Sequence, residues 1–172
     1  MSNYKENLKA ITTFVFDFDG VFTDGIIHIK GNGRQLRTVF SKDGYAIQLA
    51  LKHNFKIAII TGANAKSIKQ QFKRLGISVF LKAKNKIEVF NQYLRVHNID
   101  RKEVLVMGDD IPDYKIMLAA KIATCPADAV PEIIEVAHYI SKYPGGRGCV
   151  RDVIEQVLRS QNKWMNGDAF HW

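Results

Sequence analysis

Two aspartates stand directly behind a run of strand-forming apolar residues in 14-FVFDFDGVFTDG-25. Side chains two apart in a strand project to the same face, so Asp17 and Asp19 would crowd together beside a low-dielectric core. A hard, oxygen-seeking cation such as Mg²⁺ would relieve that repulsion and would bind phosphate oxygens as well. The structural alternative is a solvated strand exit, in which Asp24 and Gly25 cap a turn.

Two further stretches offer groups that hold anions. Thr61 and Gly62 follow the apolar run 57-IAII-60, where a hydroxyl and backbone N–H groups near a helix N-terminus would suit a phosphate. Such a pair often does no more than cap the next helix. Lys86 opens a predicted helix in 84-KNKIEVF-90, where a cation opposes the helix dipole and so indicates an external partner. A solvated surface lysine is the alternative.

A second acidic cluster, 108-GDDIPD-113, follows the apolar run 103-EVLVM-107. Its carboxylates, Asp109, Asp110 and Asp113, fall at the end of another predicted strand. Functional residues of doubly wound proteins gather at the carboxyl ends of their strands. The repeated acidity therefore indicates a cation site shared by two strand ends.

The elements that must position these residues alternate along the chain, β-rich apolar runs with amphipathic segments. This alternation predicts parallel strands joined by helical crossovers, which is an α/β fold with a doubly wound, mostly parallel sheet. The expected strands are 12–17, 57–60, 77–81, 103–107, 121–125 and a short 138–140. The expected helices are 43–53, 64–75, 85–97, 112–119 and 148–160.

Two segments depart from this alternation. Residues 26–40 read as a β-hairpin around the turn 31-GNG-33, inserted after the first strand as a flap beside the acidic site. Residues 161–172 form a tail without periodicity that carries three aromatic residues, Trp164, Phe170 and Trp172. Aromatic side chains on a polar tail need a cover, from this subunit or from a neighbour.

Composition limits the class of protein. A length of 172 residues with 47% hydrophobic content fits one domain over 1–172. We expect a soluble cytoplasmic protein, because there is no secretory signal and no apolar run approaches the roughly 18 to 20 residues that span a bilayer. The net charge of +8 favours anionic partners. Motifs for nucleic-acid binding are missing, and the basic cluster 66-KSIKQQFKR-74 is as well explained by a solvated helix face.

The order DxD, Thr-Gly, Lys and GDDxxD resembles the haloacid dehalogenase superfamily of phosphatases over nearly the whole chain. The closer resemblance is to the small 3-deoxy-D-manno-octulosonate 8-phosphate phosphatases and their relatives that act on longer sugar acids. It is carried by DFDGVFTDG, the GNG hairpin, FSKDGYAI, IITG, NKIEVF, GDDIPD and GGRGCVRDVIE.

This resemblance implies a Mg²⁺-dependent phosphatase with an aspartyl-phosphate intermediate. Asp17 would be the nucleophile and Asp19 the general acid and base, while Thr61, the Gly62 backbone and Lys86 would hold the phosphoryl oxygens. The metal ligands would be Asp17, the Asp19 carbonyl and Asp109. Asp110 and Asp113 would orient Lys86 or metal-bound waters, unless one of them is itself a ligand.

The resemblance also implies a phosphorylated sugar acid as substrate, bound by Gly62, Lys42, Asp43, Gly44 and Arg147. Lys42 and Arg147 are the cations expected to meet the sugar carboxylate, with Lys66 or Arg74 as further choices, although Arg147 also reads as a plain loop residue. The chain departs from the octulosonate-specific pattern at three positions, where arginines are replaced by Gln48, Ala63 and Gln71.

The stretches between the motifs are too short to hold a cap domain. Capless members of the superfamily cover their sites with neighbouring subunits, which implies a homotetramer with the hairpin and the tail as contact elements. A monomer with an open site is the alternative.

Two other functions remain to be separated from a phosphatase. A phosphorelay receiver domain also combines clustered acids, a threonine and a lysine, but it places the phosphorylated aspartate alone on a later strand. A catalytically silent sugar-phosphate sensor or scaffold would keep the site without turnover. Hydrolysis of a generic phosphate ester with Mg²⁺ separates both from an enzyme.

Overall fold

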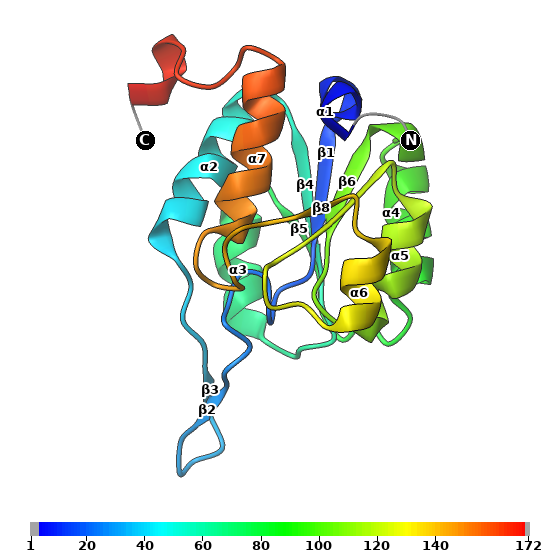
Figure 1. Ribbon diagram of the computed structural model, residues 1–172. Coiled ribbons are helices and arrows are strands. Elements are labelled where there is room, and N and C mark those ends of the chain that lie inside the picture. Colours follow the sequence, from blue (N-terminus) through cyan, green and yellow to red (C-terminus); the bar gives the residue numbers. More distant parts are fainter. Residues whose placement is uncertain (1–3, 171–172) are drawn as a thin grey trace.

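A six-stranded sheet lies at the centre of the molecule, in a computed structural model that describes residues 4–170 apart from the side chains at 67, 168 and 169. Neighbouring strands are all parallel, in the order β5-β4-β1-β6-β7-β8 (Figure 1). The strands are β1 (Thr13–Phe16), β4 (Lys56–Ile60), β5 (Ser78–Phe80), β6 (Val104–Met107), β7 (Ile122–Cys125) and β8 (Tyr139–Ile140). The chain winds outward from β1 to β5 and returns to β6, so the predicted doubly wound sheet is confirmed.

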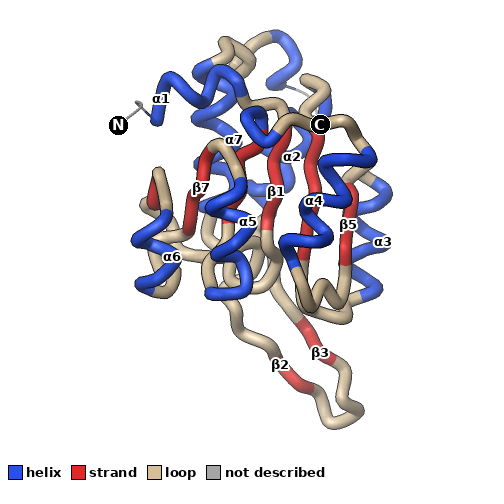
Figure 2. The backbone as a smooth tube through the Cα atoms, turned by 90° about the vertical axis from the view of Figure 1, so that its right-hand side faces the viewer, coloured by secondary structure: helices blue, strands red, loops and turns tan. Residues whose placement is uncertain are grey.

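Helices cover both faces of this sheet. They are α1 (Tyr4–Asn7), α2 (Ser41–Lys52), α3 (Lys66–Arg74), α4 (Lys86–Val96), α5 (Tyr114–Ala119), α6 (Pro131–Val136) and α7 (Cys149–Ser160). Alternate residues of a buried parallel strand face opposite cores. Phe14 and Phe16 pack with α2, α3 and α7, whereas Val15 packs with α4, α5 and α6. Figure 2 shows the second group of helices in front of the strands.

Helix α6 was not among the predicted helices, because its six residues are too few to show a period. Pro131 in its first turn was the available signal, since proline suits that position. The predicted helix over 112–119 is also divided. A 3₁₀ turn, η3 (Ile111–Asp113), precedes α5. The other 3₁₀ turns are η1 (Leu8–Ala10), η2 (Arg101–Glu103) and η4 (Gly167–Phe170).

The predicted hairpin projects beyond the carboxyl ends of the sheet (Figures 1 and 2). Its strands, β2 (His28–Ile29) and β3 (Gln35–Leu36), are antiparallel and much shorter than the segment 26–40. A turn joins them, in which the Gly33 N–H donates to the Lys30 carbonyl at 2.8 Å. Apart from this hairpin, only α2, α3, β4 and β5 lie between Asp17 and Lys86, so the expected lack of a cap in that stretch holds.

The aromatic tail is covered in part by its own subunit. The Trp164 ring meets Tyr45 edge to face with 6.0 Å between ring centroids, and the Arg151 and Arg159 guanidinium groups lie 5.2 and 5.7 Å from its centroid. Phe170 remains 69% exposed. Trp172 lies outside the described residues.

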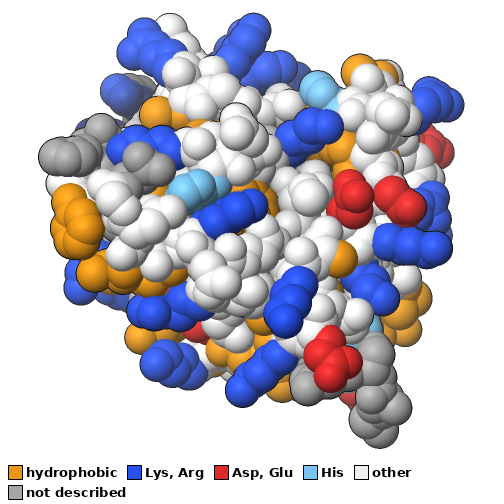
Figure 3. Space-filling view, turned by 90° about the horizontal axis from the view of Figure 1, so that it is seen from above, with side chains coloured by type: hydrophobic (Ala, Val, Ile, Leu, Met, Phe, Trp, Pro, Cys, Tyr) orange, Lys and Arg blue, Asp and Glu red, His pale blue; other side chains and the backbone are white. Residues whose placement is uncertain are grey.

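On the face at the amino ends of the strands, basic side chains are spread over the surface. Figure 3, which views the amino ends of the strands, shows lysines and arginines separated by neutral surface. Within residues 4–170, no helix has the length and apolar character needed to cross a bilayer.

Candidate active site

The acidic stretches meet because β1 lies between β4 and β6. Phe16 pairs with Ile59 on one side and with Met107 on the other, so the residues that follow these strands come together. The Asp17 N–H continues the ladder by donating to the Met107 carbonyl at 3.0 Å. The strand order reverses at this point, which is where open α/β sheets bind their ligands.

Lys86 bridges the two acidic stretches. Its Nζ lies 2.9 Å from Asp17 Oδ1 and donates to Asp113 Oδ1 at 2.7 Å. The side chain is only 5% exposed, so the alternative of a solvated surface lysine does not hold. A lysine at the first position of α4 opposes the helix dipole, and the two carboxylates supply the compensating charge.

Three carboxylates converge around this lysine. Oxygen atoms of Asp17, Asp109 and Asp113 all lie within 4.8 Å of one another. Gly20 makes this approach possible, since its φ is +87° and a Cβ there would overlap the Asp109 carboxylate. Asp109 Oδ1 and Asp113 Oδ2 are buried and have no hydrogen-bond partner among the described residues.

The electrostatics of this cluster show an unmet demand for positive charge. Burial and the neighbouring carboxylates raise the pKa of Asp109 to about 8. Burial and the Asp17 charge likewise raise the pKa of Asp113 to about 7, although Lys86 opposes the shift. Burial also raises the pKa of Asp17, against the attraction of Lys86. Burial lowers the pKa of Lys86, but its two carboxylate partners outweigh that effect and leave it raised.

A hard divalent cation fits this donor set. Mg²⁺ takes carboxylate and carbonyl oxygens, and the buried oxygens of Asp109 and Asp113 lack any other partner. One lysine cannot neutralise three carboxylates, so a cation would favour their ionised forms and lower their pKa values. The residues present therefore suit the magnesium that the sequence led us to expect.

The structure separates the roles of Asp110 and Asp113. The Ile111 N–H donates to the exposed Asp110 carboxylate at 2.7 Å, which caps η3, and Asp110 is not one of the three carboxylates of the cluster. The turn of η3 then brings Asp113 inward, where it is fully buried against Lys86. Asp113 thus orients the lysine through Oδ1, which is one of the three roles predicted for this pair.

The Asp19 carboxylate is not part of the cluster. Arg37 Nε donates to Asp19 Oδ1 at 2.7 Å, and Thr23 Oγ1 donates to the same oxygen at 3.3 Å. Metal contact through the Asp19 backbone carbonyl stays a prediction. Arg37 was not predicted, because local sequence does not reveal which residue of a hairpin will reach back to the sheet.

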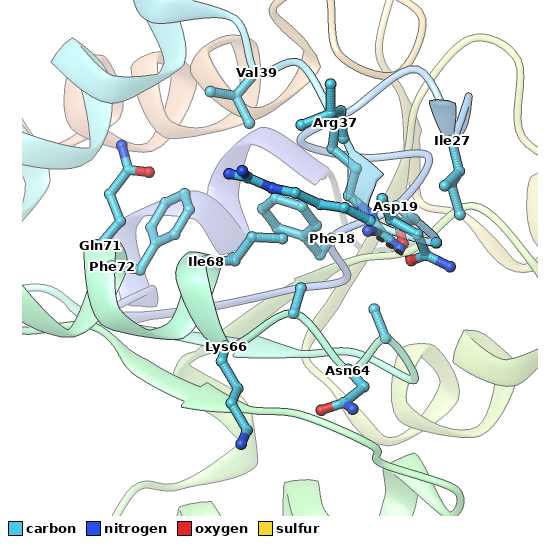
Figure 4. A pocket seen from close by; sticks show the side chains of 16 residues that line it. Phe18, Asp19, Ile27, Arg37, Val39, Asn64, Lys66, Ile68, Gln71 and Phe72 are labelled. Atoms are coloured by element: carbon cyan, nitrogen blue, oxygen red, sulfur yellow. Dashed lines mark hydrogen bonds and ion pairs between the residues drawn. The ribbon is translucent and has the colours of Figure 1, made fainter. Parts of the chain in front are cut away.

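A groove of about 870 Å³ begins at Asp19 and runs between the hairpin and α3 (Figure 4). Its basic lining residues are Arg34, Arg37 and Lys66, and Asp19 is its one acidic lining residue among those described. In Figure 4 the Lys66 side chain points away from Phe18 and Ile68, which lie in the middle of the groove. Ala63 and Gln71, which stand where arginines were expected, also line the groove, Gln71 from the same helix as Lys66.

Thr61 follows β4, the strand beside β1, and is 2% exposed. Its Oγ1 accepts the Ala63 N–H at 3.1 Å. It does not cap α3, which begins five residues later with Ala65 in the capping position. The exposed Gly62 lies next to Thr61. Phosphate binding by this pair stays a prediction.

Lys42 and Arg147 lie on a second hollow of about 470 Å³, which shares no lining residue with the groove at Asp19. Lys42 Nζ sits 5.8 Å from the Phe40 ring centroid, and Arg147 is an exposed loop residue. Their contact with a sugar carboxylate stays a prediction. The described contacts do not bring either one to the phosphoryl end of the site.

Asp43 is 2% exposed and lines neither hollow, and its contact with a substrate stays a prediction. Its Oδ1 accepts the Arg151 N–H at 2.8 Å, so it stabilises the first turn of α7. Burial raises its pKa to about 6, against the Arg151 N–H and guanidinium. Gly44 is half-buried beside it in α2.

The glycine-rich motif before α7 braces the loop that carries Asp17 and Asp19. A Cβ on Gly145 would overlap the Gly20 carbonyl oxygen, so only glycine permits this approach. The Gly146 N–H and the Cys149 thiol both donate to the Val21 carbonyl, at 2.9 and 3.2 Å. The motif therefore supports the site through its backbone.

Comparisons with known proteins agree with this geometry. The family of haloacid dehalogenase-like hydrolases matches residues 77–151. The chain is 35% identical over 159 residues to the 3-deoxy-D-manno-octulosonate 8-phosphate phosphatase of Escherichia coli (strain K12), covering 92% of this chain and 83% of that protein.

Solved structures show the same similarity. The corresponding phosphatase from Yersinia pestis superposes with a TM-score of 0.90 at 31% identity, covering 92% of this chain and 86% of that one. The phosphatase from Moraxella catarrhalis was solved with a magnesium ion, a phosphate ion and the octulosonate. It superposes with a TM-score of 0.89 at 29% identity, covering 96% of this chain and 94% of that one.

Proposed function

Because this chain belongs to the haloacid dehalogenase-like hydrolases, and within them to the family of the 3-deoxy-D-manno-octulosonate 8-phosphate phosphatases, we propose that it hydrolyses that ester or a closely related 2-keto-3-deoxy sugar acid phosphate. The observation that carries the proposal is the contact of Asp17 with Lys86 beside Asp109 and Asp113. Carboxylates and one buried lysine at a strand switch point suit phosphoryl transfer.

The cation would be held by the carboxylates of Asp17 and Asp109, with the Asp19 carbonyl as a further ligand. When bound, Mg²⁺ offsets the negative charge of the phosphoryl oxygens and so permits a carboxylate to approach them. Asp113 keeps Lys86 in place through its 2.7 Å hydrogen bond. Lys86 adds a second positive charge on the side of α4, with Thr61 and the Gly62 backbone as further phosphate contacts.

The chemical step uses two aspartates in sequence. A carboxylate oxygen of Asp17 attacks phosphorus, and the bond from phosphorus to the sugar oxygen breaks. Asp19 gives its proton to the departing oxygen, so the sugar leaves as a neutral alcohol. Asp19 then takes a proton from the water that attacks the aspartyl-phosphate, which releases inorganic phosphate and restores both carboxyl groups.

The organic part of the substrate is expected in the groove, because Asp19 lines it and must lie beside the leaving oxygen. Exposed or partly exposed apolar side chains such as Val39 and Ile68 offer a surface for the carbon skeleton, and Arg34 gives the groove positive charge. A phosphorylated sugar acid suits such a surface better than a neutral sugar phosphate does.

We propose a homotetramer, supported by the absence of a cap between Asp17 and Lys86 and by apolar side chains exposed on and beside the hairpin. These are Ile26, Ile27, Ile29, Leu36 and Val39, with Ile29 at 73% exposure. A second subunit would remove them from water. Light scattering tests the proposal, and a monomer at assay concentration would contradict it.

Phosphate release tests the activity. Purified protein with Mg²⁺ should release phosphate from 3-deoxy-D-manno-octulosonate 8-phosphate at least about tenfold faster, in kcat/KM, than from neutral hexose phosphates, a difference of roughly 1.4 kcal/mol. Excess chelator should abolish the reaction, and Mg²⁺ should restore it. A catalytically silent sensor would bind the ester without releasing phosphate, and full activity in chelator would contradict the metal assignment.

A further inference from the structure

Arg37 on the hairpin makes a direct side-chain contact with Asp19 in the loop that follows β1. Arg37, the residue after β3, donates from Nε to Asp19 Oδ1 at 2.7 Å. The Arg37 side chain is 8% exposed and that of Asp19 is 25% exposed, so this ion pair is largely shielded from water. Shielding strengthens an ion pair, because fewer solvent dipoles screen it.

The contact fixes one particular oxygen of Asp19. Arg37 and Thr23 both donate to Oδ1, Arg37 from the hairpin and Thr23 from the loop that follows β1. The Arg37 guanidinium is itself held, since its Nη1 donates to Gln35 Oε1 at 3.1 Å. Among the described contacts, Asp19 Oδ2 has no donor. Asp19 therefore lines the groove with one oxygen anchored and the other available.

We propose that Arg37 is the positioning residue for Asp19. By anchoring Oδ1 it fixes the carboxyl rotamer and leaves Oδ2 for the oxygen of the departing group. This inference rests on the proposed function, in which Asp19 transfers the proton. Misplacing a reacting group by about 1 Å can cost on the order of 10²-fold in rate. The hairpin would then contribute to chemistry as well as to the wall of the groove.

The arrangement also explains why a hairpin with such short strands stays beside the site. Its two strands share only two residue pairs, and its apolar side chains lie exposed. The ion pair from Arg37 to Asp19, supported by Gln35, ties it to the end of the sheet. Loss of that ion pair would release Asp19 and the hairpin together.

Leaving groups of different acidity distinguish this role from a merely structural one. Proton transfer matters greatly when an alkoxide must leave, as from the sugar acid phosphate, and little when p-nitrophenolate leaves. Arg37→Ala should therefore slow the first-turnover release of the sugar alcohol by about 10²-fold, and that of p-nitrophenol by less than about threefold. The loss should lie in the rate at saturating ester rather than in KM.

Lys30→Ala is the matched control, because Lys30 also lies on the hairpin, carries the same charge, is exposed and does not line the groove. It should leave both rates unchanged. Arg37→Lys should recover part of the alkyl rate, since an ammonium can still donate to Asp19. Urea denaturation of each variant verifies that the sheet is intact.

The rates on the two esters test the positioning role of Arg37 separately from the proposed phosphatase activity. Equal losses on both esters in Arg37→Ala, or a change confined to KM, would overturn the positioning role and leave Arg37 as a structural or binding residue. Unchanged rates on both esters would overturn it as well. If the wild-type protein releases phosphate from neither ester, the proposed function fails instead, which is a distinct result.

Discussion

The phosphoryl end of the site and the groove beside it are built in different ways. Asp17, Asp109 and Lys86 stand at the ends of buried strands or the start of a helix, and Asp17 is 8% exposed. The opposite wall of the groove is a hairpin whose strands have two residues each, with Ile29 73% exposed. The sheet thus fixes the reacting groups, whereas the groove depends on a few side-chain contacts.

This difference suggests a division between chemistry and selectivity. A group held by parallel strands on both sides has little freedom to move, which suits a nucleophile and its metal. The hairpin is tied to the loop after β1 by the ion pair between Arg37 and Asp19, so substitutions elsewhere on the hairpin should leave the core intact. We therefore expect changes at the strand ends to abolish activity on every ester, and changes around the groove, apart from Arg37, to alter the choice of ester.

The largest effect is expected from Asp17→Asn. Turnover should fall by at least about 10³-fold on all esters, because the amide is a poor nucleophile and no other carboxylate replaces it. The fold should remain, since burial of the charged form is a cost that the amide avoids. Steady-state assays, with mass spectrometry to exclude deamidation, measure this. Substantial turnover in a clean preparation would contradict the nucleophile assignment.

Lys86→Met should damage both activity and stability. The variant leaves Asp17, Asp113 and Asp109 without their shared cation, and breaking a buried ion pair costs about 3 kcal/mol or more. Activity should fall by about 10²-fold, and urea denaturation should show the loss of stability. Added Mg²⁺ should recover part of the stability but little of the activity. Lys86→Arg serves as the control that keeps the charge.

The choice of substrate should respond to a smaller change. Arg147→Ala, if this residue meets the sugar carboxylate, should remove most of the roughly tenfold preference for sugar acid phosphates and leave aryl phosphate hydrolysis nearly unchanged. Arg34→Ala tests whether the sugar carboxylate instead meets the arginine that lines the groove. A loss of preference in Arg34→Ala alone would place the carboxylate in the groove instead. Equal losses on both esters would show that the replaced arginine serves the fold.

The effect expected at Asp43 concerns stability only and leaves activity unchanged. Its pKa is raised from 3.8 to about 6 in the folded protein, so ionisation costs stability as pH rises through that interval. The cost is absent below pH 3.8 and complete above about 6, with an upper limit of about 3 kcal/mol. The free energy of unfolding of Asp43→Asn, relative to that of the wild type, should therefore rise between pH 4.5 and pH 7.5. A constant difference across that interval would contradict the burial argument.

Much of the phosphoryl end could be predicted from sequence, because its residues follow apolar runs long enough to identify as strands. Asp17 and Asp109 come together through a parallel pairing that the alternation of strands and helices implies. Lys86 was identifiable because a cation at the start of a helix needs an outside partner. Its two carboxylate partners confirm that reasoning.

The remaining features depend on contacts between distant segments. Arg37 meets Asp19 only because the hairpin folds back, and the spacing of residues 26–40 gives no sign of it. Asp43 was expected to bind substrate from the family resemblance alone, and local sequence gives no sign that its Oδ1 accepts a hydrogen bond from the α7 backbone. Trp164 needed a cover, and only the packing of α2 with α7 shows that its own subunit provides one.

The central claim is that Asp17 carries the phosphoryl group during turnover, and trapping that intermediate tests it most directly. In Asp19→Asn the attacking water lacks its base, while p-nitrophenol can still leave, so a phosphorylated enzyme should accumulate with Mg²⁺. Acid quenching followed by peptide mass spectrometry should find one phosphoryl group on Asp17 and none in chelator or in a variant that also carries Asp17→Asn. A phosphoryl group on another residue, or steady release of phosphate with no labelled enzyme at any time, would contradict the account.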